Sequence, residues 1–410
     1  MKPWLTVIGV GDDGLSGLSP AARALVDGAE LLVGGERHQA MAPDVSAPRL
    51  TWVDGVPKAI DAIAEWRGRR VVVLATGDPM CFGGGTNLGR RFDSTEMVVV
   101  PAPGAFSLAA ARMVWSLPDV ETVTVHGRPL ERLNLVIAPD TRLLVLSRDG
   151  DTPAQVAALL TERGFGPSTV TVLEHLGGPK ERRVDGVAET WNHPRCADLN
   201  TLAIECRAGP NAKILPRVPG LPDAVFESDG QLTKREVRAV TIAALAPLAG
   251  ETMWDVGAGS GSIAIEWLRA APALQTPGRG SARAIAIEHN AGRCATIARN
   301  ALALGVPQLE VVEAEAPACF ETLQRQPDTI FLGGGVSSPG LIEACWEALA
   351  PGGRLVANAI TIDGEACLIA FRGHHGGELT RIAISRAEPV GRLNAFKPLM
   401  EVTQYTGRKS

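Results

Sequence analysis

A glycine-rich turn between two carboxylates is the part of this sequence best suited to hold a small polar ligand. Residues 253–267 read MWDVGAGSGSIAIEW, in which an apolar run ends at Asp255 and three alternating glycines follow. Alternating glycines after a strand let the backbone approach a ligand closely, and the helix that follows points its N-terminus at that ligand. A second carboxylate, Glu288, ends the next predicted strand, where it can accept both hydroxyls of a ribose. The pattern predicts a nucleoside site.

The spacing of this turn narrows the choice of ligand. G-x-G-x-G, with an acidic residue two positions before the first glycine, resembles motif I of the Rossmann-like S-adenosylmethionine (SAM) methyltransferases. A nicotinamide dehydrogenase would more typically show G-x-G-x-x-G. For the loop taken alone, a purely structural turn and a dinucleotide site remain the alternatives.

Composition sets the class of protein. The chain of 410 residues predicts two or three domains, and 45% hydrophobic with 21% charged residues is typical of a globular protein. A formal net charge of −5 argues against nucleic acid as a partner. The seven cysteines are scattered without a C-x-x-C pair, so we expect neither a disulfide framework nor a metal site. Because we find no signal peptide pattern and no apolar run of membrane-spanning length, we expect a cytoplasmic protein without a membrane partner.

The first half of the chain contains a second set of glycine loops. T-G-D-P at 76–79 ends one predicted strand, and P-G-A-F-S at 103–107 follows the next. Loops at neighbouring strand ends form a cleft at the carboxyl edge of an open α/β sheet, where such folds bind ligands. The ordered set I-G-V-G, T-G-D-P, P-G-x-x-S, H-G-R and G-P-x-E-R-R, from residue 4 to about 206, resembles the tetrapyrrole (precorrin) methylases of the cobalamin pathway.

This resemblance implies a fold and a cofactor site. In that family SAM is held folded between two α/β lobes, mostly by backbone groups of the two loops just described. One departure is Val10-Gly11-Asp12, where many relatives carry Gly-Pro-Gly. Carried over by position, the residues that would line the first SAM site are Asp78, Pro79, Met80, Cys81, Phe106 and Ser107.

A proline-rich stretch separates the two halves. Residues 207–227 hold four prolines and show neither helix nor strand periodicity. We therefore predict a methylase domain at 1–206, a linker at 207–227 and a second domain at 228–410. In that second domain, Thr233 and Glu236 have the spacing of a capping box that starts a helix. Alternating strands and helices then predict a parallel sheet finished by an antiparallel pair, formed by LTRIAISRA and KPLMEVTQY, as in class I methyltransferases.

The second domain carries a resemblance of its own. T-K-R-E-V-R, followed by D-V-G-A-G-S-G and I-F-L-G-G-G, resembles the C-terminal, decarboxylating half of the precorrin C5,15-methyltransferases. Relatives usually show Gly-Asp-Ala where this chain has Ala314-Glu315-Ala316. The residues that would hold a second SAM are Thr233, Asp255, Gly257, Ala258, Gly259, Ser260, Gly261, Glu288, Glu315 and Ala316.

Together the two resemblances imply an α/β chain with a two-lobed tetrapyrrole methylase fold followed by a Rossmann-like class I domain, whose mixed seven-stranded sheet has helices on both faces. They imply a bifunctional enzyme of cobalamin biosynthesis with two SAM sites, expected as a homo-oligomer. It would methylate C5 and C15 of precorrin-6B and remove the carboxyl group of the ring C acetate, giving precorrin-8.

The expected chemistry needs few catalytic side chains. An electron-rich carbon attacks the methyl group, so alignment supplies much of the rate and no catalytic triad is expected. Because a corrin precursor carries many carboxylates, each pocket should contain cations. The candidates are Lys234, Arg235 and Arg238 in the second domain, and Arg128, Lys180, Arg182 and Arg183 in the first.

Two further hypotheses remain open at this point. One is a class I methyltransferase that acts on RNA or protein, although the sequence lacks an N/D-P-P-Y/F motif near Leu332. The other is a non-catalytic regulator that binds SAM, which a methyl transfer assay would separate from the enzymes.

Overall fold

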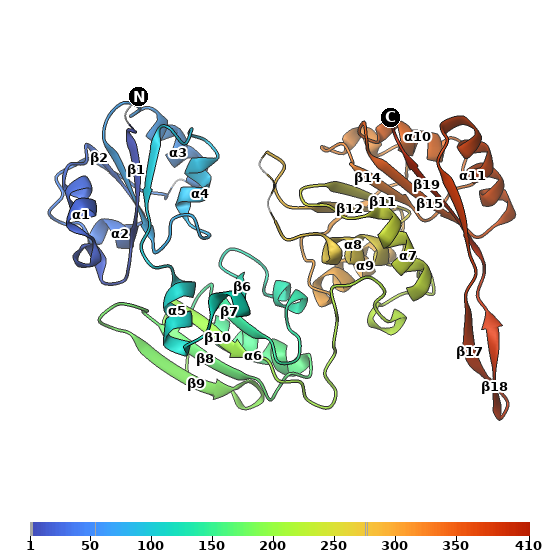
Figure 1. The fold of residues 1–410 in the computed structure, drawn as a ribbon, viewed down its shortest axis with the longest axis horizontal. Coiled ribbons are helices and arrows are strands. Elements are labelled where there is room, and N and C mark those ends of the chain that lie inside the picture. The colour runs from blue at the N-terminus through green and yellow to red at the C-terminus, as the bar shows by residue number, and fades with distance from the viewer. Residues whose placement is uncertain (1–2, 54, 275, 277) are drawn as a thin grey trace. The chain divides into compact units, whose positions relative to one another are not determined.

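The computed structural model describes residues 3–53, 55–274, 276 and 278–410, and the chain forms two compact units (Figure 1). Unit 1 consists of Met1–Leu130 and Val136–Ile214, and unit 2 of Glu131–Leu135 and Leu215–Ser410. The predicted linker 207–227 is thus divided between the two units. No helix in the described part of the chain has the length and apolar character that crossing a bilayer requires.

The first lobe of unit 1 is a five-stranded parallel sheet in the order β3-β2-β4-β1-β5. Its strands alternate apolar side chains between two cores, so that Val7 packs on one face and Ile8 on the other. Ser19 caps helix α1 by accepting from the Ala22 N–H, with Pro20 at the first helical position. The elements are β1 (Leu5–Val10), α1 (Pro20–Asp27), β2 (Leu31–Val33), α2 (Glu36–Ala40), β3 (Arg49–Leu50), α3 (Val56–Ala64), β4 (Val71–Thr76), α4 (Gly84–Gly89) and β5 (Met97–Val100).

The second lobe of unit 1 is a mostly antiparallel sheet in the order β6-β7-β10-β8-β9. Helix α5 packs Phe106, Ala109 and Ala110 against this sheet, so the P-G-A-F-S loop that starts α5 is fixed from below. The elements are α5 (Ala105–Met113), β6 (Glu121–Thr124), β7 (Arg142–Leu146), α6 (Thr152–Glu162), β8 (Thr169–Glu174), β9 (Arg182–Val187) and β10 (Asn200–Glu205).

Unit 2 contains the predicted mixed seven-stranded sheet, in the order β13-β12-β11-β14-β15-β19-β16. Pairing is parallel up to β15 and antiparallel for β19 and β16. Helices α7, α8 and α9 cover one face, and α10 and α11 the other (Figure 1). The elements are α7 (Arg235–Leu245), β11 (Thr252–Val256), α8 (Ser262–Ala270), β12 (Arg283–Glu288), α9 (Ala291–Ala303), β13 (Glu310–Glu313), β14 (Thr329–Leu332), α10 (Leu341–Ala348), β15 (Arg354–Ala359), α11 (Ile362–His375), β16 (Glu378–Ile382) and β19 (Val402–Arg408).

The C-terminal strands differ from the prediction. Instead of one long pair, the chain leaves the sheet after β16 and forms a separate hairpin of β17 (Ser385–Val390) and β18 (Leu393–Pro398) before returning as β19. This hairpin extends away from the sheet (Figure 1) and exposes Leu393 and Phe396. Alternating residues predict a strand but not the sheet to which that strand belongs, and this is why the sequence missed the hairpin.

The predicted capping box at the start of α7 is wrong. Lys234 occupies the N-cap position and makes no side-chain capping bond. The Glu236 carboxylate instead accepts from Arg386 on β17, at 2.6 Å. A long-range ion pair has therefore replaced the local hydrogen bond that the spacing indicated.

A buried ion pair joins three elements of unit 2. Arg354, the first residue of β15, is bonded to Glu251 at 2.5 Å, and both side chains are less than a tenth exposed. The Arg354 guanidinium also donates to the carbonyl groups of Leu245 and Ala246 at the end of α7. Arg354 thus satisfies helix-end carbonyls that have no partner within the helix.

We predict that Arg354→Ala lowers the free energy of unfolding of unit 2 by about 3–5 kcal/mol, because it leaves the Glu251 charge buried and unpaired. The control is Arg381→Ala, which breaks a surface pair with Glu365 and should cost less than about 1 kcal/mol. Urea titration followed by circular dichroism measures both. Equal losses in the two variants would contradict the prediction.

Candidate cofactor sites

The glycine loop of unit 2 is shaped by backbone contact. Gly257 has φ +71°, and a Cβ atom there would lie 3.1 Å from the Gly334 backbone nitrogen, on the loop that follows β14. Gly261 has φ +76° and starts α8. L-residues with side chains rarely adopt such φ values, and the first position has no room for a side chain. The carboxyl edges of β11 and β14 therefore meet backbone to backbone, as a close approach to a nucleoside requires.

Asp255 lies beneath this loop and is fully buried. Its Oδ2 accepts from the Ala264 N–H in the first turn of α8 at 3.0 Å, whereas its Oδ1 has no hydrogen-bond partner within the described residues. Burial, together with the nearby Glu288 charge, raises the pKa of Asp255 to about 7. The carboxyl group therefore ties strand β11 to helix α8 and retains one unused acceptor.

Glu288 holds the middle of the loop from the neighbouring strand. Its Oε2 accepts from the Gly259 N–H at 2.9 Å, and its Oε1 accepts from the Asn290 N–H at 3.1 Å. Only 3% of the residue is exposed. A carboxylate has about four lone-pair sites, so these two bonds leave acceptors for ribose hydroxyls. The predicted ribose contact stays a prediction.

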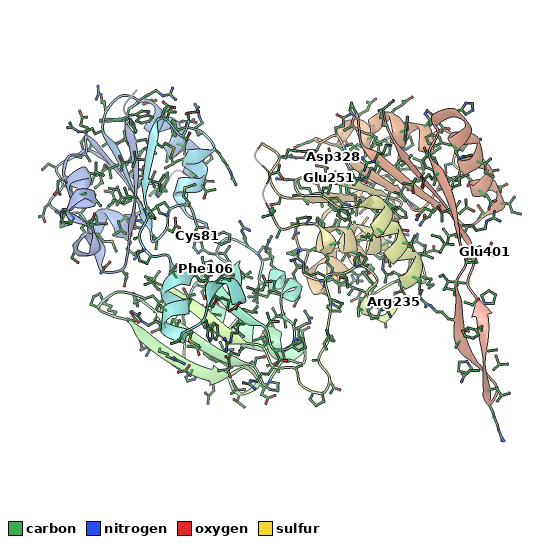
Figure 2. All side chains as sticks on the ribbon, viewed as in Figure 1. Cys81, Phe106, Arg235, Glu251, Asp328 and Glu401 are labelled. Carbon is green, nitrogen blue, oxygen red and sulfur yellow. The ribbon has the colours of Figure 1, made fainter. Side chains whose placement is uncertain are left out.

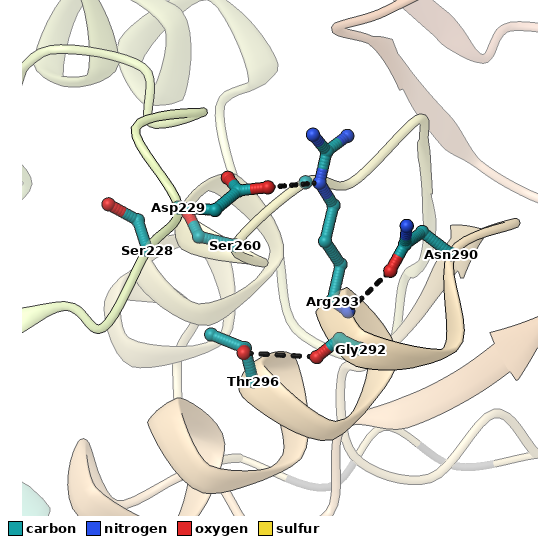
Figure 3. Close-up of a pocket in the computed structure, with 8 residues that line it drawn as sticks. Ser228, Asp229, Ser260, Asn290, Gly292, Arg293 and Thr296 are labelled. Carbon is teal, nitrogen blue, oxygen red and sulfur yellow. Dashed lines mark hydrogen bonds and ion pairs between the residues drawn. The ribbon is translucent and has the colours of Figure 1, made fainter.

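A cavity of about 200 Å³ opens beside the loop (Figure 3). Across it, Arg293 near the start of α9 donates to Asp229 at 2.8 Å, and the Asn290 side chain caps α9 by accepting from the Arg293 N–H. The Ser260 hydroxyl is buried and has no partner in the described structure. The cavity is lined by Ser228, Asp229, Gly259, Ser260, Asn290, Gly292, Arg293 and Thr296.

These features fit SAM at the edge of unit 2. The cradle at Gly257 admits only backbone, and the unused acceptors of Asp255 and Ser260 lie at the same loop. The sequence analysis missed Asp229 and Arg293. Neither belongs to a motif, and their pairing joins positions 64 residues apart.

The other predicted residues of this site surround the loop. The Ala258 N–H donates to the Ile287 carbonyl at 3.1 Å, so β12 supports the loop from its side. Thr233 is half-buried and precedes α7, while Ala316 is half-buried and Glu315 exposed on the loop after β13. Glu315 therefore presents its longer side chain to solvent.

The prediction that Arg238 faces the substrate is wrong. Its side chain has no exposed surface and is bonded to Glu266 at 2.6 Å. The same guanidinium donates to the carbonyl groups of Leu221 and Thr233, each at 2.5 Å. The prediction rested on the need for cations near a substrate with many carboxylates, but Arg238 lies on the face of α7 that packs against the core. Arg238 fixes the backbone at Thr233 instead, whereas Lys234 and Arg235 are exposed.

In unit 1 the two predicted cofactor loops lie against each other. Gly77 has φ +58°, and a Cβ atom there would lie 3.0 Å from the Gly104 Cα. The Ala102 N–H donates to the Gly77 carbonyl at 3.2 Å. The ends of β4 and β5 thus form one continuous backbone surface, which fits a cofactor held mainly by backbone groups.

Side chains of the first site follow the order T-G-D-P and P-G-A-F-S. Asp78 accepts from the Met80 N–H at 2.8 Å, which closes the turn around the buried Pro79. Phe106 is 7% exposed at the start of α5, and Ser107 and Cys81 are exposed (Figure 2). Burial and the Asp78 charge raise the pKa of the Cys81 thiol, so it is a poor nucleophile at neutral pH.

An exposed aromatic side chain that the sequence analysis did not single out joins this site. The Phe82 ring packs edge-on against Phe106, with ring centroids 6.1 Å apart, and the Arg128 guanidinium lies 5.5 Å from the Phe82 ring. Arg128 is thereby brought to the predicted cofactor loops from the H-G-R segment. The Arg128 guanidinium thus lies beside an aromatic ring that packs on the second of these loops, and its role toward a substrate stays a prediction.

Two of the three remaining candidate cations of unit 1 have protein partners. Arg182 is bonded to the buried Glu174 at 2.6 Å, and Arg183 to Asp185 at 2.9 Å. Lys180 is exposed on the loop between β8 and β9.

Comparison with known proteins gives two family matches, one for each half. Residues 4–191 match the tetrapyrrole (corrin/porphyrin) methylases, and residues 224–409 match the precorrin methyltransferase domain. A precorrin-6Y C(5,15)-methyltransferase (decarboxylating) from Sinorhizobium is 48% identical over 410 residues, covering 100% of this chain and 97% of that protein.

Two shorter relatives each match less than half of the chain. A cobalt-precorrin-7 C(5)-methyltransferase from Salmonella typhimurium is 31% identical over 43% of this chain and 88% of its own. A probable cobalt-precorrin-6B C(15)-methyltransferase (decarboxylating) from Saccharolobus solfataricus is 32% identical over 41% of this chain and 85% of its own.

The raised pKa of Asp255 predicts an unusual dependence of stability on pH. Between the ordinary value of 3.8 and about 7, the unfolded chain binds fewer protons than the folded one, so this carboxyl group lowers stability as pH rises. Asp255→Asn keeps an acceptor for the Ala264 N–H and cannot ionise. We predict that, in the absence of ligand, the free energy of unfolding of the variant rises relative to that of the wild type by a few kcal/mol between about pH 4 and about pH 7. Urea unfolding at each pH tests this, and a constant difference would contradict it.

The corrected position of Arg238 predicts a contrast with Lys234. Arg238→Ala should weaken binding of S-adenosylhomocysteine in unit 2 and cost about 3–5 kcal/mol of stability, because Glu266 loses its buried partner. Lys234→Ala should leave both unchanged and raise the KM for the tetrapyrrole. Calorimetry, urea unfolding and steady-state kinetics separate the two. A stable Arg238→Ala variant with normal cofactor binding would contradict the assignment.

Proposed function

The chain belongs to the precorrin-6Y C5,15-methyltransferases (decarboxylating), and on that premise we propose how the reaction is divided between its two units. The enzyme is a SAM-dependent methyltransferase of cobalamin biosynthesis, which methylates C5 and C15 of its precorrin substrate and removes one carboxyl group as carbon dioxide. The RNA, protein, nicotinamide and regulator hypotheses are therefore set aside.

The proposed domains are a tetrapyrrole methylase at 1–206, a linker at 207–227 and a class I methyltransferase at 228–410. Each is proposed to hold its own SAM, giving two sites per chain. The support is that each half has its own glycine loops at the carboxyl edge of a parallel sheet, built from different motifs. We further propose that the chain works in the cytoplasm as a homo-oligomer, without nucleic acid or membrane.

The chemistry asks for alignment more than for acid-base groups. When bound, SAM supplies an electrophilic methyl group. The backbone surfaces at Gly77 with Gly104 and at Gly257 with Gly334 would each fix a cofactor in one orientation, and preorganisation of this kind contributes much of the rate. In unit 1, Arg128 would pair with a substrate carboxylate above the Phe82 ring.

Decarboxylation is assigned to residues 211–410. When the acetate arm loses carbon dioxide, its carbon–carbon bond breaks, the electron pair enters the conjugated macrocycle, and a proton later returns to the arm. The protein then only has to orient and desolvate the carboxylate. Lys234 and Arg235 are exposed at the start of α7 and could hold that carboxylate. They should not pair with it too strongly, because a stabilised ground state would slow its loss.

The names of the shorter relatives support an assignment of the two carbons. The Saccharolobus relative combines C15 methylation with decarboxylation, whereas the Salmonella relative is a C5 enzyme without it. If decarboxylation belongs to unit 2, C15 methylation belongs there as well, and C5 is left to unit 1.

Blocking one loop at a time tests this division. Gly259→Trp should fill the second cofactor site, so that the product carries one added methyl group and keeps its carboxylate. Gly104→Trp should fill the first site, leaving C15 methylation and decarboxylation intact. Mass spectrometry of the products, with two-dimensional NMR to locate the methyl group, distinguishes these outcomes.

The matched control for Gly259→Trp, whose φ is +59°, is Gly352→Trp. Gly352 also has a positive φ, +75°, and a Cβ atom there would meet no other atom within 4 Å, so this variant measures backbone strain alone. Calorimetry should count two S-adenosylhomocysteine molecules per control chain and one per blocked chain. Loss of carbon dioxide from the Gly259→Trp reaction would assign decarboxylation to unit 1 instead.

A further inference from the structure

Asp12 is the centre of a charged network that no cofactor motif accounts for. Its carboxylate, with a 14% exposed side chain, accepts from Arg37 at 2.9 Å through one oxygen and contacts the His175 Nδ1 at 3.0 Å through the other. A Cβ atom at Gly178 would lie 2.4 Å from the Asp12 Oδ2, so the loop after β8 packs directly on this carboxylate.

The network lies where the two lobes of unit 1 meet. Asp12 follows β1 at the carboxyl edge of the first sheet, and Arg37 also donates to the hydroxyl of Thr76, the first residue of T-G-D-P, at 2.8 Å. From the second lobe, Leu176 packs in the same apolar cluster as Phe106. His175 is thus linked through Asp12 and Arg37 to Thr76 of the first loop, while its neighbour Leu176 packs with Phe106 of the second.

The ring of His175 is held in one orientation. The residue has φ +50°, a conformation stabilised by its backbone bond to Leu199 and by that of Gly178 to its own carbonyl. With the Nδ1–H donated to Asp12, the neutral ring has its lone pair on Nε2. Within the described residues no protein group is bonded to this Nε2, and the side chain is 26% exposed. The geometry resembles the carboxylate–histidine pairs that accept protons in many enzymes.

We propose that His175, oriented by Asp12, accepts the proton that the tetrapyrrole releases during the methylation in unit 1. This rests on the proposed function of that unit. In the overall step a carbon–carbon bond forms, the carbon–sulfur bond of the cofactor breaks and its electron pair stays on sulfur. The macrocycle then loses one proton to restore conjugation. The Nε2 lone pair takes that proton, and the Asp12 carboxylate stabilises the imidazolium.

The neighbouring histidine is less suited to this role. Burial and the Arg37 charge lower the pKa of His38 to about 4, so its ring holds a second proton weakly near neutral pH. The charged groups that face His175 come from four elements: Asp12 after β1, Arg37 on α2, Glu174 on β8 and Arg182 on β9. Glu181 on its own loop pairs with Arg112 of α5.

His175→Asn is the discriminating variant in the full-length chain. Asparagine tolerates positive φ, and its Nδ2 can donate to Asp12 much as Nδ1 does, but it has no titratable ring. If His175 accepts the proton, C5 methylation should fall by about 100-fold or more, whereas C15 methylation and decarboxylation stay normal. Calorimetry should still count two S-adenosylhomocysteine molecules per chain.

The pH profile separates chemistry from positioning. In the wild type the rate of C5 methylation should fall as the solution becomes acidic, because a protonated imidazole accepts no further proton. In His175→Asn this fall should disappear while the rate stays low at every pH. Asp12→Asn, which loses the charge beside the ring, should show an intermediate rate with normal cofactor binding.

Two results would overturn the proposal. A His175→Asn variant with the wild-type rate and profile would show that the ring only joins the lobes, and loss of cofactor binding in unit 1 would show a positioning role. Failure of the proposed function looks different. The unmutated chain would then bind no cofactor in unit 1, or would methylate C5 with Gly104→Trp in place, and the role of His175 would fall with it.

Discussion

The predicted cofactor site of unit 2 depends on two buried carboxylates that fix the conformation of its glycine loop through hydrogen bonds. Asp255 bonds the first turn of α8, and Glu288 bonds the backbone of Gly259, so the loop is tied to two strands and one helix at once. Glycine at positive φ is costly to order, and these bonds help to offset that cost. Burying a carboxyl group with one unused oxygen is itself unfavourable, as the raised pKa of Asp255 reflects. A site built this way is stable enough to fold and still gains from a ligand.

Unit 1 reaches a similar result by other means. Its loops are fixed by direct backbone contact between Gly77 and Gly104. The charged group beside them is the Asp12 carboxylate, which is bonded to Arg37. Since Asp12 bonds groups from α2 and from the loop after β8, one carboxylate joins both lobes at the edge of the predicted site. The two units therefore use carboxylates differently: unit 2 buries them under the cofactor loop, whereas unit 1 places one where the lobes meet.

Sequence reasoning predicted what local patterns encode. Strand-glycine-helix order located the loops at Asp78, Ser107 and Gly257, and the resemblance to class I methyltransferases implied the seven-stranded sheet that the structure shows. It failed where distant residues decide the outcome. Arg238 was predicted to face the substrate. Its guanidinium instead donates inside the core, to Glu266 and to the carbonyl groups of Leu221 and Thr233. The β17–β18 hairpin has the same alternation as the sheet strands, so period alone could not separate it.

The correction at Arg238 also changes how unit 2 should handle its substrate. Because the Arg238 guanidinium is paired with Glu266, the exposed cations at the start of α7 are Lys234 and Arg235. Lysine acts as a point charge, whereas arginine can donate two hydrogen bonds to one carboxylate. Lys234 is the N-cap residue and Arg235 the first residue of α7, and the buried Arg238 fixes this end of the helix. A cation that is exposed and only loosely held can orient a carboxylate without stabilising it strongly, whereas a preorganised buried arginine would bind the ground state tightly. If decarboxylation takes place in unit 2, as proposed, it benefits from the first arrangement, because the charge must leave the carboxylate for the macrocycle. A buried Arg238 that only fixes the helix, together with exposed cations at its start, is therefore consistent with a site that orients an acetate arm without slowing its decarboxylation.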